Sequence, residues 1–389
     1  MLRSLYSGIS GLRAHQTMLD VTGNNIANVN TQGFKASSVQ FEDTLSQMTK
    51  GASGPQGGNG GTNPAQVGLG VQVAGIATNF TQGSSQTTGK NTDMMISGDG
   101  FFISKQGTET LYTRSGSLSQ DPQGRLVTPD GAIVQGWMAG PNGTITGGPV
   151  RDMVLSTATL APAAATTKAT VGGNLPGDAA VPTTLVKPFQ VYDATGNAST
   201  VNLTFTHTAA GSWNVSDGAG GTATLNFANG QPTAGSSKSM TIGGVAVDLS
   251  TVTGFTGMST VTANSVDGGT AGTLQSFSLA KDGTIMGAFS NGSKQAVGRI
   301  ALANFTNPEG LEKAGSSSYR TSANSGTANV GTAGAGGLGT LLGGQLEMSN
   351  VDLSQEFTNL IVAQRGFQAN ARTITTSDQI LQELIDLKR

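Results

Sequence analysis

Apolar side chains recur with a helical period over the first thirty residues. They fall three, four or seven positions apart, at Leu2, Leu5, Ile9, Leu12, Leu19 and Ile26. Such spacing places side chains on one face of an α-helix. Repeated asparagines from Asn24 onward and then Gly33 mark a helix stop followed by a turn. We therefore predict an amphipathic helix at the start of the chain.

The last forty residues repeat this pattern over a greater length. A heptad series is formed by Leu353, Leu360, Phe367, Ile374 and Leu381, and it is flanked by Phe357, Ile361 and Leu384. Asp352 is the predicted N-cap, because Gln355 follows three residues later. Heptad spacing is typical of helices that pair along a seam, so we expect the two terminal helices to form a coiled-coil element.

Between the two helices the apolar positions alternate in short segments that are broken every 8 to 12 residues by Gly, Asp, Asn or Pro. Turns are predicted at Asp121–Gly124 and at Asp130-Gly131, and a one-sided strand at 201–207 with its hairpin partner at 213–215. Residues 51–70 and 322–344 are rich in glycine and polar residues, and we interpret both as loops. Residues 156–184, mostly Ala, Thr and Pro, suggest a connection between domains.

These elements predict a mainly β protein with α-helical termini and two nested β domains, the second inserted in the first. We expect four parts, two of which are discontinuous in sequence. They are a terminal helical core domain (1–34 and 350–389), a connecting region (35–71 and 322–349), an inner β domain (72–150 and 274–321) and an outer inserted β domain (151–273).

Composition narrows the classes of function. The 21 Lys and Arg against 23 Asp and Glu leave a formal net charge of -2, so we expect neither nucleic acid nor a membrane surface as a partner. Only 11% of residues are charged against about 25% in ordinary domains, a surface that favours association. There is no cysteine, and we expect no cleaved leader and no membrane-spanning helix.

The residues that could carry chemistry are few. His15 and His207 are the only histidines, too few for a histidine metal site, and we interpret them as a partly exposed helix residue and a core or rim residue. Gly334, Gly336 and Gly339 match a dinucleotide-binding spacing but lack the flanking strand and helix, so we interpret them as loop. We therefore predict no catalytic, cofactor-binding or metal-binding residues, and no enzymatic activity.

The terminal apolar stripes have two interpretations. An amphipathic helix most often covers the core of its own domain. These helices, however, lie at the chain ends beyond glycine-rich segments. If copies pack through them head to tail, the interface is heterologous and generates an open helical filament. We predict that the apolar positions of both stripes, from Leu2 to Ile26 and from Leu353 to Leu384, form an assembly interface.

Motifs near both ends of the chain stand out. They are Ser7–Leu12, Leu19–Asn28 and Gly33-Phe34-Lys35 at the N-terminal end, and Ser349–Ser354 and Ile361–Asn370 at the C-terminal end. In these motifs the chain resembles the bacterial flagellar rod and hook proteins. The signature positions of the resemblance are Gly23, Asn24, Asn25, Ala27, Asn28, Gly33, Phe34, Asn350, Asp352, Gln364 and Arg365. The segment Val67–Val71 and the large β insertion favour the hook branch of the family.

This resemblance implies a structural subunit of the flagellar hook, a flexible curved tube that acts as a universal joint and transmits motor torque from rod to filament. It also implies an extracellular location in the hook of the basal body, reached without a cleaved signal peptide. The implied partners are other copies of the chain, the distal rod protein, the hook cap protein, the hook-filament junction protein and the flagellar type III export apparatus. A rod subunit is the nearest alternative. A secreted adhesin or a cell-wall hydrolase is a more distant one.

Overall fold

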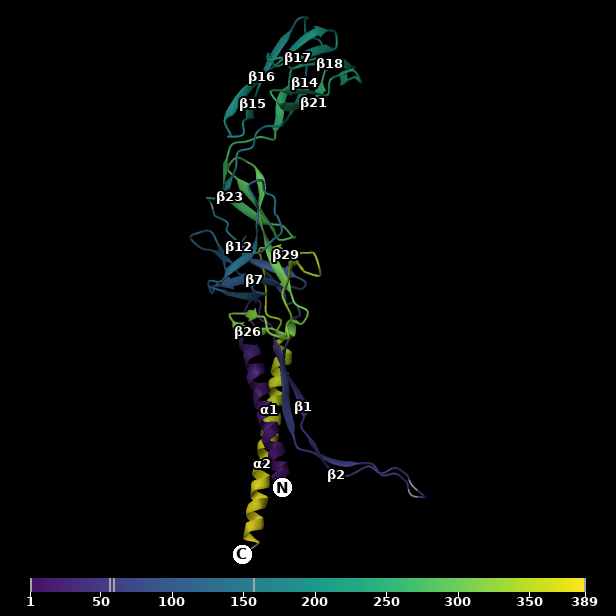
Figure 1. The fold of residues 1–389 in the computed structure, drawn as a ribbon, viewed down its shortest axis with the longest axis vertical. Coiled ribbons are helices and arrows are strands. Elements are labelled where there is room, and N and C mark those ends of the chain that lie inside the picture. Colours follow the sequence, from purple (N-terminus) through teal and green to yellow (C-terminus); the bar gives the residue numbers. More distant parts are fainter. Residues whose placement is uncertain (1, 56, 59, 157, 388–389) are drawn as a thin grey trace.

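A computed structural model describes residues 2–55, 57–58, 60–156 and 158–387. The molecule is elongated, with a helical pair at one end, a β body in the middle and a second β body at the other end (Figure 1). Both chain ends lie at the helical end (Figure 1). In the part of the chain that is described, no helix has the length and apolar character needed to cross a membrane.

Two long helices form the helical end. α1 spans Leu2–Ala27 and α2 spans Leu353–Asp386, and the two pack side by side in opposite directions (Figure 1). The Asp352 carboxylate accepts hydrogen bonds from the backbone N–H groups of Ser354 and Gln355, which confirms the predicted N-cap. The predicted mainly β fold with paired terminal helices is therefore confirmed.

A long β-hairpin, here called the arm (residues 37–78), leaves the helical end beside α1 (Figure 1). Its strands are β1 (Ser37–Asp43), β2 (Ser46–Lys50), β3 (Ala65–Gly68) and β4 (Val71–Thr78). β1 pairs with β4 and β2 pairs with β3, both antiparallel. The loop prediction for 51–70 was wrong at β3. An exposed hairpin has no buried face, so its sequence lacks the alternation that predicts a strand.

The inner β body is built on a 13-stranded sheet. Its strands are β7 (Phe101–Gln106), β8 (Glu109–Thr113), β9 (Ser119–Gln120), β10 (Leu126–Val127), β11 (Ile133–Met138), β12 (Arg151–Asp152), β13 (Leu160–Ala161), β23 (Gly272–Leu279), β24 (Thr284–Phe289), β25 (Lys294–Asn304), β26 (Glu312–Gly315), β27 (Ser318–Arg320) and β28 (Asn329–Thr332). Two separate pairs add β5 (Ser85–Thr87) with β30 (Gln345–Glu347) and β6 (Met94–Ser97) with β29 (Thr340–Gly343). A short 3₁₀ turn, η1, spans Pro308–Gly310.

This sheet is buried on both faces. Phe102 and Leu302 belong to one hydrophobic cluster, while their neighbours Phe101 and Ala303 belong to another. Successive side chains of a strand point to opposite faces, so the two clusters lie on either side of the sheet. The predicted turns are confirmed, since Gly124 donates to the Asp121 carbonyl and Val127 pairs with Ile133 across Asp130-Gly131.

The outer β body consists of two sheets that share one hydrophobic core. The first contains β15 (Thr184–Tyr192), β16 (Ala198–Ala209), β17 (Ser212–Ser216), β18 (Thr222–Ala228) and β19 (Gln231–Pro232). The second contains β14 (Lys168–Asn174), β20 (Ser239–Ile242), β21 (Val245–Thr253) and β22 (Thr262–Val266). Pairing of β16 with β17 confirms the predicted hairpin of 201–207 with 213–215.

Two interpretations of loops need correction. β14 lies inside the predicted connection 156–184 and buries Ala169 and Val171 in the outer core. β28 and β29 lie inside the predicted loop 322–344 and pair with β25 and β6. Both stretches are short or rich in small residues, so pairing with distant strands decides their structure rather than local propensity. Gly334, Gly336 and Gly339 do lie in the loop between β28 and β29, as predicted.

Candidate assembly site

Glycines in the seam between α1 and α2 make room for larger side chains of the facing helix. Gly8 and Gly11 are buried, and a Cβ atom added to Gly8 would lie 3.2 Å from the Ile374 side chain. A Cβ atom added to Gly11 would lie 2.8 Å from the Asn370 side chain, and one added to Gly366 would lie 2.5 Å from the His15 ring. Glycine permits such close approach because it carries no side chain. The glycines therefore receive the side chains of Ile374, Asn370 and His15 from the facing helix.

The predicted interface residues divide into three groups. Half-buried along the helical pair are Leu5, Ile9, Leu12, Leu19, Ile26, Leu360, Phe367, Ile374 and Leu381. Leu353, Phe357 and Ile361 are exposed by 40%, 52% and 55%. The side chains of Leu2 and Leu384 lie outside the described part of the chain. The heptad seam of large side chains was thus wrong at the start of α2, where these side chains face away from α1.

Where the helical pair meets the inner β body, three ionic side chains are buried together. The Lys35 Nζ atom lies 2.6 Å from Oε1 of Glu347, and both side chains are fully buried. The Arg114 guanidinium lies 3.6 Å from the other carboxylate oxygen and donates to the Gly98 carbonyl. Removing one member would leave an uncompensated charge in the interior, so the cluster acts as one unit.

Burial shifts the pKa values of two basic groups in this cluster. It lowers the pKa of the Lys35 ammonium, while the Glu347 carboxylate opposes that shift by stabilising the charged form. The same burial lowers the pKa of the Arg114 guanidinium. The Gly83 backbone N–H also donates to Glu347, at 2.9 Å. These donors around one carboxylate fix the directions in which the segments at 35, 83, 114 and 347 leave the junction.

Signature residues complete the same junction. Asn25 on α1 donates to the Ser37 carbonyl at 2.7 Å and accepts from the Ser37 N–H at 3.0 Å. Asn350 accepts from the Ala36 N–H at 2.8 Å and donates to the carbonyls of Asn79 and Thr81. A side-chain amide satisfies a backbone donor and acceptor at once, as a paired strand would. These asparagines therefore join segments that no sheet connects.

Gly33 closes the junction because no other residue fits there. Its φ is +66°, and an added Cβ would lie 2.6 Å from the Ser115 nitrogen. Its N–H donates to the Glu347 carbonyl at 2.8 Å. Other signature residues, namely Gly23, Ala27, Gln364 and Arg365, occupy exposed helix positions. The sequence identified these residues as a signature but gave no signal for the polar contacts between distant segments.

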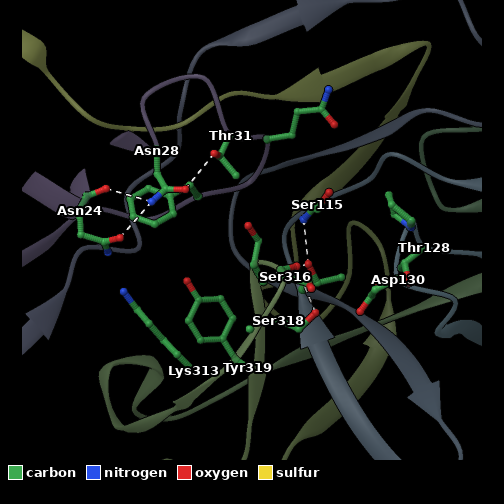
Figure 2. A pocket seen from close by; sticks show the side chains of 16 residues that line it. Asn24, Asn28, Thr31, Ser115, Thr128, Asp130, Lys313, Ser316, Ser318 and Tyr319 are labelled. Carbon is green, nitrogen blue, oxygen red and sulfur yellow. Dashed lines mark hydrogen bonds between the residues drawn. The ribbon is translucent and has the colours of Figure 1, made fainter. Parts of the chain in front are cut away.

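A polar cleft of ≈ 620 Å³ lies beside the junction, between the end of α1, the turn after it and the β26–β27 hairpin (Figure 2). Asn28 donates to the carbonyl and side-chain oxygens of Asn24 and accepts from the Thr31 hydroxyl (Figure 2). Lys313 and Tyr319 form part of its wall, and burial raises the pKa of Tyr319 to about 12. The lining consists largely of amides and hydroxyls, which suit hydrogen bonding rather than proton transfer.

A groove of ≈ 450 Å³ lies between α1 and the arm. Its lining includes Tyr6, Ile9 and Arg13 from α1 and Leu69 and Val71 from the arm. The Val71 N–H donates to the Ser10 hydroxyl at 3.3 Å, which fixes the arm against the helix at this point. The groove is open and mostly apolar, as expected of a surface that receives another side chain.

The histidines do not form a reactive site. His207 is buried, as predicted for a core residue, and its ring stacks on Trp213 at 4.7 Å between centroids. His15 is partly exposed, as predicted, and lies in the helical seam. Among the described residues no group of His, Asp or Glu could hold a metal ion.

Comparison with known proteins identifies the family. Residues 5–35 match the model "Flagella basal body rod protein", residues 95–173 match "Flagellar hook protein FlgE/F/G D1 domain", and residues 342–387 match "Flagellar basal body rod FlgEFG protein C-terminal". A solved structure of the Helicobacter pylori flagellar hook protein FlgE2 aligns with a TM-score of 0.47 at 13% identity, covering 66% of this chain and 98% of that one.

Several relatives align along their full length. The flagellar hook protein FlgE of Borreliella burgdorferi is 40% identical over 100% of both chains. FlgE of Salmonella typhimurium is 36% identical over 99% of this chain and 100% of its own. The flagellar basal-body rod protein FlgG of Bacillus subtilis is 35% identical over 100% of both. These full-length matches and the three family models show that the chain belongs to the flagellar rod and hook protein family.

Proposed function

We propose that this chain is the structural subunit of the bacterial flagellar hook and that it polymerises through its terminal helices. The observation that carries the proposal is the apolar stripe of Leu353, Phe357 and Ile361, which is exposed in the single subunit. An apolar stripe of this size on a helix is removed from water only when it packs against another surface. The names of the relatives, hook protein at up to 40% identity, supply the location.

In this proposal the subunit has no catalytic role. Its function is mechanical: the tube it forms is curved and flexible, and it transmits torque from rod to filament. We divide the subunit as the sequence predicts, into terminal helices, connecting region, inner β domain and outer β domain. Distal rod, cap and hook-filament junction proteins would be its neighbours along the axis, and a type III apparatus would export it.

The polymerisation step can be tested with Phe357→Asp. Phe357 is exposed in one subunit, so folding of the single chain should change by less than about 0.5 kcal/mol. Polymers would lose the burial of an aromatic ring and gain a buried charge. We expect the critical concentration for tube formation, measured by sedimentation and electron microscopy, to rise at least about 100-fold, or about 2.7 kcal/mol.

Val186→Asp is the matched control, because Val186 is also an exposed apolar residue but lies on the outer β body. We expect it to form tubes at the parent concentration. Tubes of normal length and number from Phe357→Asp would contradict assembly through the helices.

A rod subunit is the alternative, supported by the FlgG relative of equal coverage. Gold-labelled antibody against the outer β body would distinguish the two. Label on the curved segment outside the cell envelope supports the hook, whereas label confined to the straight segment within the envelope supports the rod.

A further inference from the structure

We propose that the stripe of Leu353, Phe357 and Ile361 on α2 docks into the groove between α1 and the arm of a second copy of this chain. The proposal rests on the self-assembly set out above and names the two surfaces that meet.

The stripe is one continuous apolar surface. Its three residues are four positions apart, so they lie one above another on the same face of α2. Within the subunit that face is not the one used for pairing, because Gly366, Asn370 and Ile374 make the contacts with α1. The stripe therefore remains free when the helical pair has formed.

The groove offers the complementary surface. Ile9, Leu69 and Val71 give it apolar walls, and Tyr6 stands at its edge. Arg13 adds a positive charge and makes no ion pair within the described chain. An occupant with large apolar side chains would cover the apolar walls and leave the exposed Arg13 guanidinium in water.

Three contacts give the register of the two helices. Asn25 bonds to Glu356, and Gly11 and Gly366 lie against Asn370 and His15. In each pair (25 and 356, 11 and 370, 15 and 366) the residue numbers add to 381. By this register Phe357 lies level with residue 24 of α1, whereas the groove extends only from residue 6 to residue 17.

The stripe and the groove are therefore offset within one subunit. Level 24 is twelve residues from level 12 near the middle of the groove, which is about 18 Å at a rise of 1.5 Å per residue. A displacement of this length therefore brings the stripe onto the apolar walls of the groove. Glu356 takes no part in this contact, because its carboxylate accepts a hydrogen bond from Asn25 of its own α1.

The offset, in a chain of a family of axial flagellar proteins, favours a second copy as the occupant. Stripe and groove cannot meet within one chain, but a neighbour displaced by about 18 Å along the helices presents one to the other. Each copy then uses its stripe on one neighbour and its groove on another. Such a contact is heterologous and propagates without closing on itself, as a tube requires.

The chain contains no cysteine, so the contact can be tested by introduced disulfides. Ile361 is level with residue 20, and the displacement brings it level with residue 8, next to Leu69. In the double variant Ile361→Cys, Leu69→Cys the two sulfurs of one chain are too far apart to bond. We expect mild oxidation of assembled tubes to convert most of the protein into a ladder of disulfide-linked oligomers longer than dimers.

The matched control is Ile385→Cys with Leu69→Cys, since Ile385 is an exposed apolar residue of α2 outside the stripe. It should give no ladder. If the first double variant forms no tubes, coassembly of its two single variants replaces it, and the expected product is a disulfide dimer with one copy of each.

Tubes without the cross-linked product would overturn the docking proposal and leave self-assembly intact. Failure of the cysteine-free parent chain to form tubes under any condition would overturn the proposed function, and the docking proposal with it.

Discussion

The outer β body and the helical pair solve the burial of apolar residues in opposite ways. The outer body encloses its largest side chains, and Trp213 and Phe205 are fully buried between its two sheets. The helical pair buries glycine, alanine and serine and leaves Phe357 and Ile361 in water. The first region is complete within one chain, whereas the second keeps its strongest apolar surface for another copy.

The largest expected loss of stability comes from creating a cavity in the core of the outer β body. Trp213→Ala should destabilise the outer body by about 3–5 kcal/mol, the usual cost of deleting a fully buried aromatic ring. Chemical denaturation followed by circular dichroism measures this loss, and Trp137 in β11 reports on the inner body by fluorescence.

For that variant, Val186→Ala is the control and should change stability by less than about 0.5 kcal/mol, because Val186 is exposed. Tube formation by Trp213→Ala below the unfolding transition should match the parent. Loss of tubes under those conditions would mean that the two regions are not independent.

A smaller effect is expected at the seam of the helical pair. Gly366→Ala places a Cβ atom 2.5 Å from the His15 ring, so the ring must leave its position or the helices must move apart, at a cost of about 1–3 kcal/mol. Gly23→Ala is the matched substitution, since no atom lies within 4 Å of its added Cβ. It should stabilise α1 by up to about 1 kcal/mol.

Hydrogen exchange of the helix amides measures both glycine variants. Protection should fall in Gly366→Ala and rise in Gly23→Ala. Equal changes in the two variants would show that close approach of the helices is not what glycine provides at the seam.

The smallest expected effect is on the acid stability of a turn in the outer β body. Asp193 lies between β15 and β16, where hydrogen bonds from the Thr195 hydroxyl and the Asn197 N–H lower the pKa of its carboxyl to about 2. A folded-state pKa below the usual 3.8 means that the charged carboxylate stabilises the folded turn. The contribution of the Asp193 carboxylate to folding stability is present above about pH 3.8 and is lost as the pH falls through about 2.

Nuclear magnetic resonance titration of the Asp193 carboxyl carbon should give its midpoint near 2, and Asp193→Asn should remove this part of the acid dependence. A midpoint at 3.8 would contradict the bonded turn. The helical pair, which lacks this turn, should be unaffected by the substitution.

Local pattern predicted a large share of this fold. The period of Leu5, Ile9 and Leu12 gave α1, and the cap at Asp352 gave the start of α2, because helices depend on near neighbours in sequence. Turn chemistry gave the hairpins at Asp121 and Asp130. The local sequence pattern did not predict which surface of another element each apolar face packs against. The heptad series placed both Leu353 and Ile374 in the seam; Ile374 packs against Gly8, whereas Leu353 is exposed.

The junction was hidden from the sequence for a different reason. Asn25 and Asn350 act on backbone groups of other segments, and Lys35 acts on Glu347. Single polar residues carry no period, and the contacts they make depend on a fold that is already assembled. The motif resemblance included most of these positions, but only the folded structure shows which residue each one contacts.

The Lys35–Glu347 contact also sets an order of events in folding. Its partners are 312 residues apart in the chain, so forming it from an unfolded chain closes a very long loop. Each β body, by contrast, contains hairpins that close locally, and such contacts form sooner. We therefore expect the β bodies to fold first and to shorten the remaining loop, and the ion pair and the pairing of the two helices to follow. A subunit made in this order presents its adhesive surface only after the rest of it is finished, which limits contact between incomplete chains.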